Sequence, residues 1–185
     1  MNVAACCFVV ALLVGAAAAT EAPPEPPDYR MDDYRAPTPA TLHGAAVLST
    51  DQAEGHWDKR DAAFIDVLPQ PPRPAGLPAS TIWRSKPRFD IPGSIWLPDT
   101  GYGALAPVMQ GYFERGLQQA TGGDRGRMIV FYCLANCWMS WNAAKRAIAL
   151  GYARVAWYPA GTDGWAEQHL PLEARTPVAR PQSAE

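Results

Sequence analysis

The sequence predicts an α/β domain with a mostly parallel central sheet and helices on both faces. The main observation is that short apolar runs, typical of buried strands, alternate along the chain with segments of helical periodicity. The second observation is size and composition. At 185 residues, with 48% hydrophobic and 18% charged residues, the chain fits one folded unit better than two independent cores.

Four apolar runs have the length and composition of strands. Residues 62–68 read Ala-Ala-Phe-Ile-Asp-Val-Leu and end at a Pro-rich loop, which is typical of a buried strand leaving a sheet. The other predicted strands cover residues 93–98, 127–132 and 153–159. The third of the four runs ends directly before Cys133.

Helices are predicted between these strands. A Ser-Thr pair at residues 49–50, followed by an acidic first turn, predicts a helix of about two turns. Residues 106–120 carry apolar side chains at roughly helical spacing, and residues 140–150 form a stronger helical pattern that Gly151 closes at C′. The last segment before the C-terminal region, residues 160–165, is predicted to be a turn.

The N-terminus has the pattern of a secretory signal. A short apolar segment at residues 8–14 precedes Gly15 and a run of alanines, so residues 1–19 are predicted to be a signal peptide cleaved after Ala19. The apolar segment is shorter than the roughly 20 residues that a spanning helix needs. We therefore expect export, with no membrane span once the signal is removed.

The remaining chain divides into three parts. Residues 20–41 are rich in proline, acidic residues and tyrosine, and are predicted to be an extended linker. Residues 42–172 contain all the predicted strands and helices and form the single domain. Residues 173–185 are predicted to be a disordered tail.

The charge of the chain argues against two classes of partner. The formal net charge is −2, which gives no field that would attract nucleic acid or an anionic membrane surface. We therefore expect no nucleic-acid partner.

Two cysteines carry the chemical interest of the sequence. Cys6 and Cys7 lie inside the predicted signal, so Cys133 and Cys137 would be the only thiols of the mature protein. In an oxidising compartment two nearby thiols either pair or are kept reduced by a partner. Their redox state is therefore expected to matter for function.

Cys133 is the predicted nucleophile of the pair. It lies where a strand runs into a helix N-terminus, a position at which free amides and the helix dipole favour an anion. We expect this environment to lower the pKa of the Cys133 thiol. A thiolate or a persulfide would both fit there, with Cys137 as the second sulfur.

Other uses of the pair do not fit the sequence. A structural zinc site needs four ligands, and His43, His56 and His169 are scattered far from the cysteines. Covalent haem needs C-x-x-C-H, which is absent. A cysteine phosphatase needs an arginine at the end of the loop, where this chain has Met139. We expect no metal and no resident cofactor, only a transient persulfide or disulfide.

The residues around the pair are assigned roles in the site. Asn136 lies in the loop between the cysteines, and Trp138 and Trp141, one turn apart, would flank a pocket on the same side. Ser140 is predicted to cap the N-terminus of the helix, with a hydroxyl donor role toward Cys133 as the second interpretation.

Two charged residues from other segments are expected near the site. Asp66, embedded in the first apolar run, is predicted to be structural and to accept hydrogen bonds from loop amides. Arg88, with Arg84, lies in a basic loop that is either solvated or supplies positive charge to the site.

These positions together resemble the rhodanese-like domain, the sulfurtransferase fold. Ile65-Asp66-Val67 resembles the first-strand signature of that family, residues 91–95 resemble its Ile-Pro-Gly-Ala/Ser-Ile segment, and residues 130–151 resemble its strand, cysteine loop and helix. The resemblance covers roughly residues 42–172 and implies a rhodanese fold with Cys133 as the reactive residue.

Residues 132–142 also resemble a narrower subfamily. They are similar to the small exported proteins named for a Cys-pair-Trp motif, CXXCW, although this chain reads C-x-x-x-C-W. That resemblance implies periplasmic localisation and a role in catabolism by alcohol dehydrogenases that depend on pyrroloquinoline quinone (PQQ). The partner would be a component of a periplasmic redox system or of the PQQ-dehydrogenase system.

The chain also departs from familiar rhodaneses. Leu68 stands where they carry arginine, and the loop between the cysteines has neither glycine nor arginine. Three functions remain open. Cys133 could carry a persulfide and transfer sulfur from a small sulfur-containing substrate; the pair could exchange disulfides, with a mixed disulfide at Cys133 resolved by Cys137; or the domain could be a non-catalytic periplasmic accessory module with a loop disulfide.

Overall fold

The computed structural model describes residues 22–71, 73–78, 80–84 and 86–180, so the predicted signal peptide lies outside the described residues. Within them, five parallel strands form a sheet in the order β1-β6-β5-β2-β4. Their bounds are Ala45–Val47 (β1), Ala62–Asp66 (β2), Ile95–Trp96 (β4), Met128–Tyr132 (β5) and Val155–Trp157 (β6). The predicted α/β class is confirmed.

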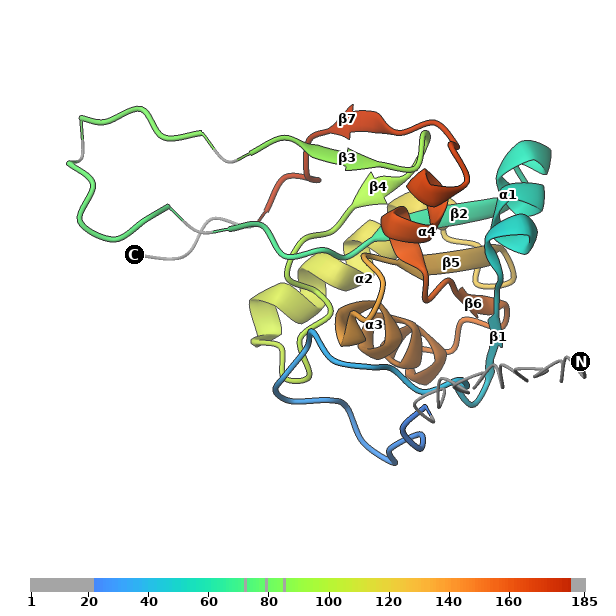
Figure 1. The fold of residues 1–185 in the computed structure, drawn as a ribbon. Coiled ribbons are helices and arrows are strands. Elements are labelled where there is room, and N and C mark those ends of the chain that lie inside the picture. Colours follow the sequence, from blue (N-terminus) through green and yellow to red (C-terminus); the bar gives the residue numbers. More distant parts are fainter. Residues whose placement is uncertain (1–21, 72, 79, 85, 181–185) are drawn as a thin grey trace, which may run out of the picture.

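Four helices cover the sheet on both faces (Figure 1). They are α1 (Thr50–Lys59), α2 (Pro107–Thr121), α3 (Trp138–Ala149) and α4 (Gly161–Glu167). Side chains from α2 and α3 share one hydrophobic cluster with one face of the sheet. Side chains from α1 and α4 share a second cluster with the other face.

The alternation of a strand explains the two clusters. In β5, Ile129 and Phe131 join the cluster under α2 and α3, whereas Val130 and Tyr132 join the cluster under α1 and α4. All five residues of β5 are buried, as expected for a central parallel strand that is covered on both faces. Cys133 continues the first of these two faces.

The helix ends follow local sequence rules with one difference from prediction. Ser49 and Gln52 form a capping box at the start of α1, and Gly151 has a φ of 84° just beyond the end of α3. The start of α3 differs, because the helix begins at Trp138 with Cys137 as its N-cap residue. Ser140 therefore lies in the first turn and is not the cap.

The C-terminal segment is more structured than the sequence predicts. Residues 160–165, predicted to be a turn, mostly belong to α4, whose two glycines and short length hide the helical pattern. Within the predicted tail, Glu173–Arg175 instead forms β7, which pairs antiparallel with β3 (Arg88–Asp90). The tail is held further by the Val178 amide, which donates to the carbonyl of Trp96.

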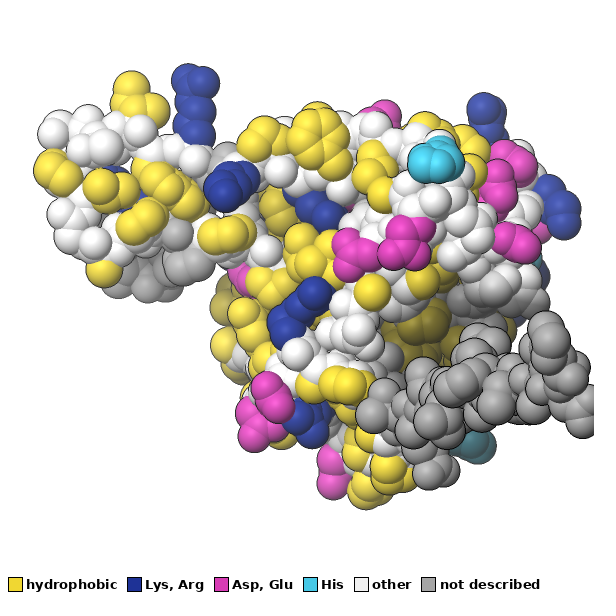
Figure 2. All heavy atoms as spheres, viewed as in Figure 1, with side chains coloured by type: hydrophobic (Ala, Val, Ile, Leu, Met, Phe, Trp, Pro, Cys, Tyr) yellow, Lys and Arg dark blue, Asp and Glu magenta, His cyan; other side chains and the backbone are white. Residues whose placement is uncertain are grey.

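Two long segments of the described chain have no helix or strand. The predicted linker covers residues 20–41, and its described part, residues 22–41, lies along α3 through side-chain bonds from the helix to its backbone. The described parts of residues 69–87 belong to a loop that extends away from the body of the domain (Figure 1), and Figure 2 shows it projecting at the left of the view. Among the described residues, no helix is long and apolar enough to cross a membrane.

Candidate functional site

The candidate site lies at the carboxyl edge of the parallel sheet. β5 ends at Tyr132, Cys133 follows, and α3 begins five residues later at Trp138. Asp66, the last residue of β2, is in register with Tyr132. Ligands of open α/β sheets bind at this edge, so the topology places Asp66 beside the cysteine loop.

Cys133 and Cys137 are joined by a disulfide. Their Cα atoms are 6.5 Å apart, within the range that a disulfide allows. Both side chains are buried, with exposed fractions of 0% and 2%, and both belong to the cluster under α2 and α3. The two cysteines are thus oxidised to a disulfide and shielded from solvent.

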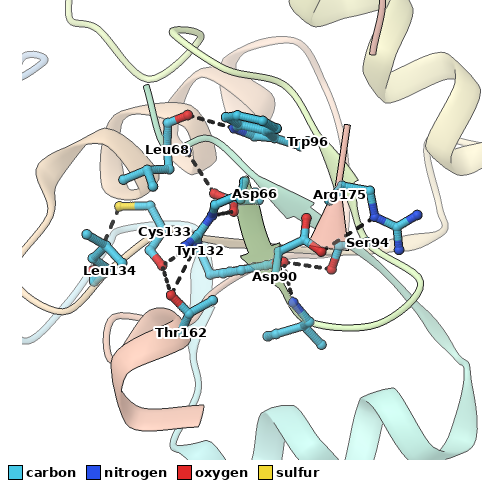
Figure 3. A network of polar contacts seen from close by, with 12 residues as sticks. Asp66, Leu68, Asp90, Ser94, Trp96, Tyr132, Cys133, Leu134, Thr162 and Arg175 are labelled. Carbon is cyan, nitrogen blue, oxygen red and sulfur yellow. Dashed lines mark hydrogen bonds and ion pairs between the residues drawn. The ribbon is translucent and has the colours of Figure 1, made fainter. Parts of the chain in front are cut away.

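The polar groups around the Cys133 sulfur atom differ from the free amides that the sequence predicts there. Within the described residues, the polar atoms recorded next to the Cys133 Sγ are the carbonyl oxygens of Leu134 and Cys137, at 3.8 and 3.9 Å. Figure 3 shows this sulfur pointing away from Asp66, toward Leu134. Cys137, as the N-cap residue of α3, occupies the position where the helix dipole favours negative charge.

Arg88 links the end of β2, the cysteine loop and the start of α4 through its guanidinium group. Its Nε donates to Asp66 Oδ2 at 2.5 Å, and its Nη2 donates to the carbonyl of Cys133 at 3.3 Å and to the Thr162 hydroxyl at 3.2 Å. The Arg88 side chain is only 10% exposed and that of Asp66 is fully buried. The positive charge of Arg88 is therefore neutralised by Asp66, whereas Arg84, the other cation considered for the site, is exposed.

Asp66 accepts a hydrogen bond from one loop amide at the end of β2. The amide of Leu68 donates to Asp66 Oδ1 at 2.8 Å. Burial raises the pKa of the Asp66 carboxyl, and the charge of Arg88 opposes that rise. The carboxyl thus joins β2 to the segment that precedes β3.

A second buried carboxyl extends this network (Figure 3). Asp90 is fully buried, its Oδ1 lies 3.5 Å from the Arg175 Nε, and its Oδ2 has no hydrogen-bond partner among the described residues. Nearby, the Tyr132 hydroxyl donates to the Ser94 Oγ at 2.7 Å and accepts the Ile91 amide. Burial, with the negative charge of Asp66, raises the pKa of Asp90 to about 7.

This raised pKa predicts a specific pH dependence of stability. In the unfolded chain Asp90 ionises near its usual value of 3.8, so between about pH 4 and pH 7 only the folded state holds the proton. Stability from this group is therefore present below pH 4 and lost as pH rises toward 7. The difference in unfolding free energy between Asp90→Asn and the wild type should therefore shift in favour of the variant by about 2 to 4 kcal/mol from pH 4.5 to pH 8. Urea unfolding of both proteins at the two pH values measures this shift. The same difference at both pH values would contradict the prediction.

The remaining predicted site residues lie on the loop and the first turn of α3. Ser140 Oγ donates to the Cys137 carbonyl at 3.1 Å and accepts the indole N–H of Trp157 at 3.0 Å, so its hydroxyl is not directed to Cys133. Trp138 and Trp141 make an edge-to-face contact with ring centroids 5.4 Å apart. Asn136 is exposed and has a φ of 51°, in the left-handed region.

Residues at the start of α4 also hold the loop, and none of them was predicted to lie in the site. The Thr162 amide donates to the Cys133 carbonyl at 3.0 Å, and the Ala135 amide donates to Asp163 Oδ2 at 3.0 Å. Gly161 has a φ of 55°, and a Cβ there would lie 2.6 Å from the Cys133 carbonyl oxygen. These contacts join the cysteine loop to residues about 28 positions later, in a segment predicted to be a turn. No local sequence pattern could therefore reveal them.

The described part of the chain contains no group of three or more His, Cys, Asp or Glu side chains suited to a metal. The reactive groups of this arrangement are the two sulfur atoms of Cys133 and Cys137. The loop backbone is held by Arg88 from β3 and by Thr162 and Asp163 from α4.

Comparisons with known proteins agree with this fold. The family model described as "Rhodanese-like domain" matches residues 49–168. Among solved structures, thiosulfate sulfurtransferase from Pseudomonas aeruginosa is 16% identical with a TM-score of 0.49, covering 76% of this chain and 22% of that chain. The polysulfide-sulfur transferase homodimer from Wolinella succinogenes is 18% identical with a TM-score of 0.45, covering 72% and 81%.

An uncharacterized protein from Saccharomyces cerevisiae is 21% identical with a TM-score of 0.41, covering 67% of this chain and 92% of that chain. No curated protein matches the chain.

Proposed function

The chain belongs to the rhodanese-like domain family, and from this premise we propose that it is a thiol–disulfide exchange protein whose redox centre is the Cys133–Cys137 pair. The observation that carries the proposal is the disulfide itself, which joins the residue after β5 to the N-cap residue of α3. Because both cysteines lie outside the strands, the disulfide can break and form again without a rearrangement of the sheet.

The exchange can be written with both electrons accounted for. A thiolate of a partner dithiol attacks the Cys133 Sγ, a new S–S bond forms, and the Cys133–Cys137 bond breaks. Cys137 leaves as a thiolate at the N-cap of α3, where the helix dipole stabilises it. The second partner thiol then attacks the mixed disulfide and frees Cys133. The partner is oxidised, the pair is reduced, and the two protons of the partner thiols pass to the two cysteines.

Sulfur transfer is the second candidate, favoured by the family. It would require the site to hold an anionic sulfur donor next to Cys133. Arg88, which binds the Cys133 carbonyl, is already paired with Asp66, so its charge is neutralised. The geometry therefore supports disulfide exchange better than a persulfide on Cys133.

The finer setting of this activity is also part of the proposal. The predicted signal peptide at residues 1–19 and the C-x-x-x-C-W motif support an exported, periplasmic protein of the CXXCW subfamily. Its partner would be a component of a periplasmic redox system or of the PQQ-dependent alcohol dehydrogenase system. N-terminal sequencing of the mature protein should begin at Thr20, and an intact Met1 would contradict export by this signal.

Mass spectrometry of protein isolated from its compartment, with thiols blocked at lysis, tests the main proposal. The expected result is two interconverting forms, one oxidised and one with both Cys133 and Cys137 alkylated, whose ratio follows the supply of reductant. An added sulfur atom on Cys133 would favour sulfur transfer instead. A single oxidised form under all conditions would indicate a structural disulfide and contradict exchange.

A further inference from the structure

Access to the disulfide is restricted in the described structure. Disulfide exchange requires a thiolate to reach a sulfur atom directly, yet Cys133 and Cys137 are 0% and 2% exposed. If the proposed function holds, part of the protein must move before a partner thiol can react. The segment best placed to move is the strap, which we define as residues 26–41.

The strap crosses the start of α3 next to Cys137. The backbone amide of Trp138 donates to the carbonyl of Tyr34 at 2.9 Å, and its indole N–H donates to the carbonyl of Pro37 at 3.1 Å. Tyr34 and Ala36 pack against the hydrophobic cluster that contains both cysteines. The strap thus satisfies an amide of the first turn of α3 and covers the core around the pair.

Further along α3, side chains of the helix hold the strap by its backbone. Asn142 accepts the Arg30 amide at 2.9 Å and donates to the Arg30 carbonyl at 2.8 Å. The indole of Trp141 donates to the carbonyl of Thr41 and the amine of Lys145 donates to that of Pro26. These contacts hold an extended chain regardless of its side chains.

Two features make the strap able to leave without unfolding the domain. The strap forms no helix and no strand, so it is not part of either sheet. A cavity of about 630 Å³ is lined by strap residues, among them Arg30, Pro37 and Thr38, and by Asn136 and Trp138, so the strap is not fully packed beside the cysteine loop. Segments with few regular backbone bonds open at lower free energy than core strands.

We infer that the strap is a gate over the disulfide: with residues 26–41 on α3 the pair is closed to thiols, and their release opens it. This inference rests on the proposed function and adds its regulation. The observed rate of reduction is then the intrinsic rate multiplied by the fraction of molecules with the strap released. A partner that binds the strap, or takes its place on α3, would activate exchange.

Tyr34→Ala is the variant that tests the gate. The Tyr34 hydroxyl donates to the Met31 carbonyl and accepts the Gly103 amide, and its ring packs edge-to-face on Tyr102 at 5.3 Å. Removing this anchor should raise the rate of disulfide reduction by dithiothreitol at least tenfold. Arg35→Ala, at an exposed neighbouring position, should leave the rate unchanged.

A second control separates local opening from unfolding. Phe64→Leu loosens the core on the opposite face of the sheet and should not change the reduction rate in the absence of denaturant. The rate for Tyr34→Ala should rise only weakly with urea, because strap release exposes far less surface than unfolding. Equal rates for Tyr34→Ala and Arg35→Ala, or a steep urea dependence like that of unfolding, would overturn the gate.

The gate and the proposed function can fail separately. The reduction rate by a small dithiol reports on access alone. The cellular redox state of the pair reports on exchange. A gated disulfide that never cycles in its compartment would retain the gate and reject the function.

Discussion

Replacing Cys137 with Ser is expected to abolish disulfide exchange, because the variant cannot form the Cys133–Cys137 disulfide that oxidises a partner dithiol. In the reverse direction, Cys133 attacks the disulfide of an oxidised partner and stays in the mixed disulfide, because Cys137 is absent and cannot release it. Cys133→Ser should also abolish exchange, because two electrons cannot be stored on one thiol. This variant should accumulate less adduct, since it lacks the sulfur that the partner attacks.

The measurement is the reduction of a disulfide-bonded polypeptide by the reduced form of each variant, with products and covalent adducts identified by mass spectrometry. Asn136→Ala, in the same loop but exposed, serves as the matched control and should retain exchange. Full activity in either cysteine variant would contradict the two-cysteine mechanism. The five-residue disulfide ring adds little to stability, so both cysteine variants are expected to fold. Circular dichroism checks that any loss of exchange is not a loss of folding.

Arg88→Met is expected to destabilise the domain by about 3 to 5 kcal/mol, because it leaves the buried Asp66 carboxylate without its partner. The Arg88 side chain is 10% exposed, and its bonds to Asp66 and to the Cys133 carbonyl would both be lost. The exposed Arg84, in the loop that precedes β3, provides the comparison, and Arg84→Met should cost less than about 0.5 kcal/mol. Urea unfolding at pH 7 compares the two variants.

The double variant Asp66→Asn with Arg88→Met identifies the cause. Without the buried charge, much of the lost stability should return, as removal of both partners of a buried pair is often close to neutral. A loss of less than about 1 kcal/mol for Arg88→Met alone would show that the pair does not hold the loop. No recovery in the double variant would place the effect in packing instead of charge.

The elements that the sequence predicted well are those with strong local patterns. The buried runs that became β2 and β5 and the helix α3 have periodicity and composition that few other structures satisfy. They also place Cys133 at the strand end, so the position of the site followed directly from its neighbours. The short strands β3 and β7 could not be predicted, since three residues carry no period and their pairing joins segments more than 80 residues apart.

The site was predictable in its residues but not in its contacts. Arg88 and Asp66 were both expected near the loop, yet their pairing depends on the β3 path, which the sequence does not define. The start of α3 was placed too late because Ser140 is a favourable cap, whereas burial of Trp138 and the bond to Tyr34 begin the helix earlier. Proline-rich composition likewise suggested a free linker, and the backbone carbonyls of that segment proved to be its anchor on α3.

The reduction potential of the Cys133–Cys137 pair tests the central claim most directly. It is measured by equilibrating the full mature chain with glutathione buffers and counting alkylated thiols by mass. An exchange protein should titrate as one two-electron couple between about −270 and −120 mV, the range of known exchange proteins. A potential below about −300 mV would identify a structural disulfide and contradict the proposed exchange function.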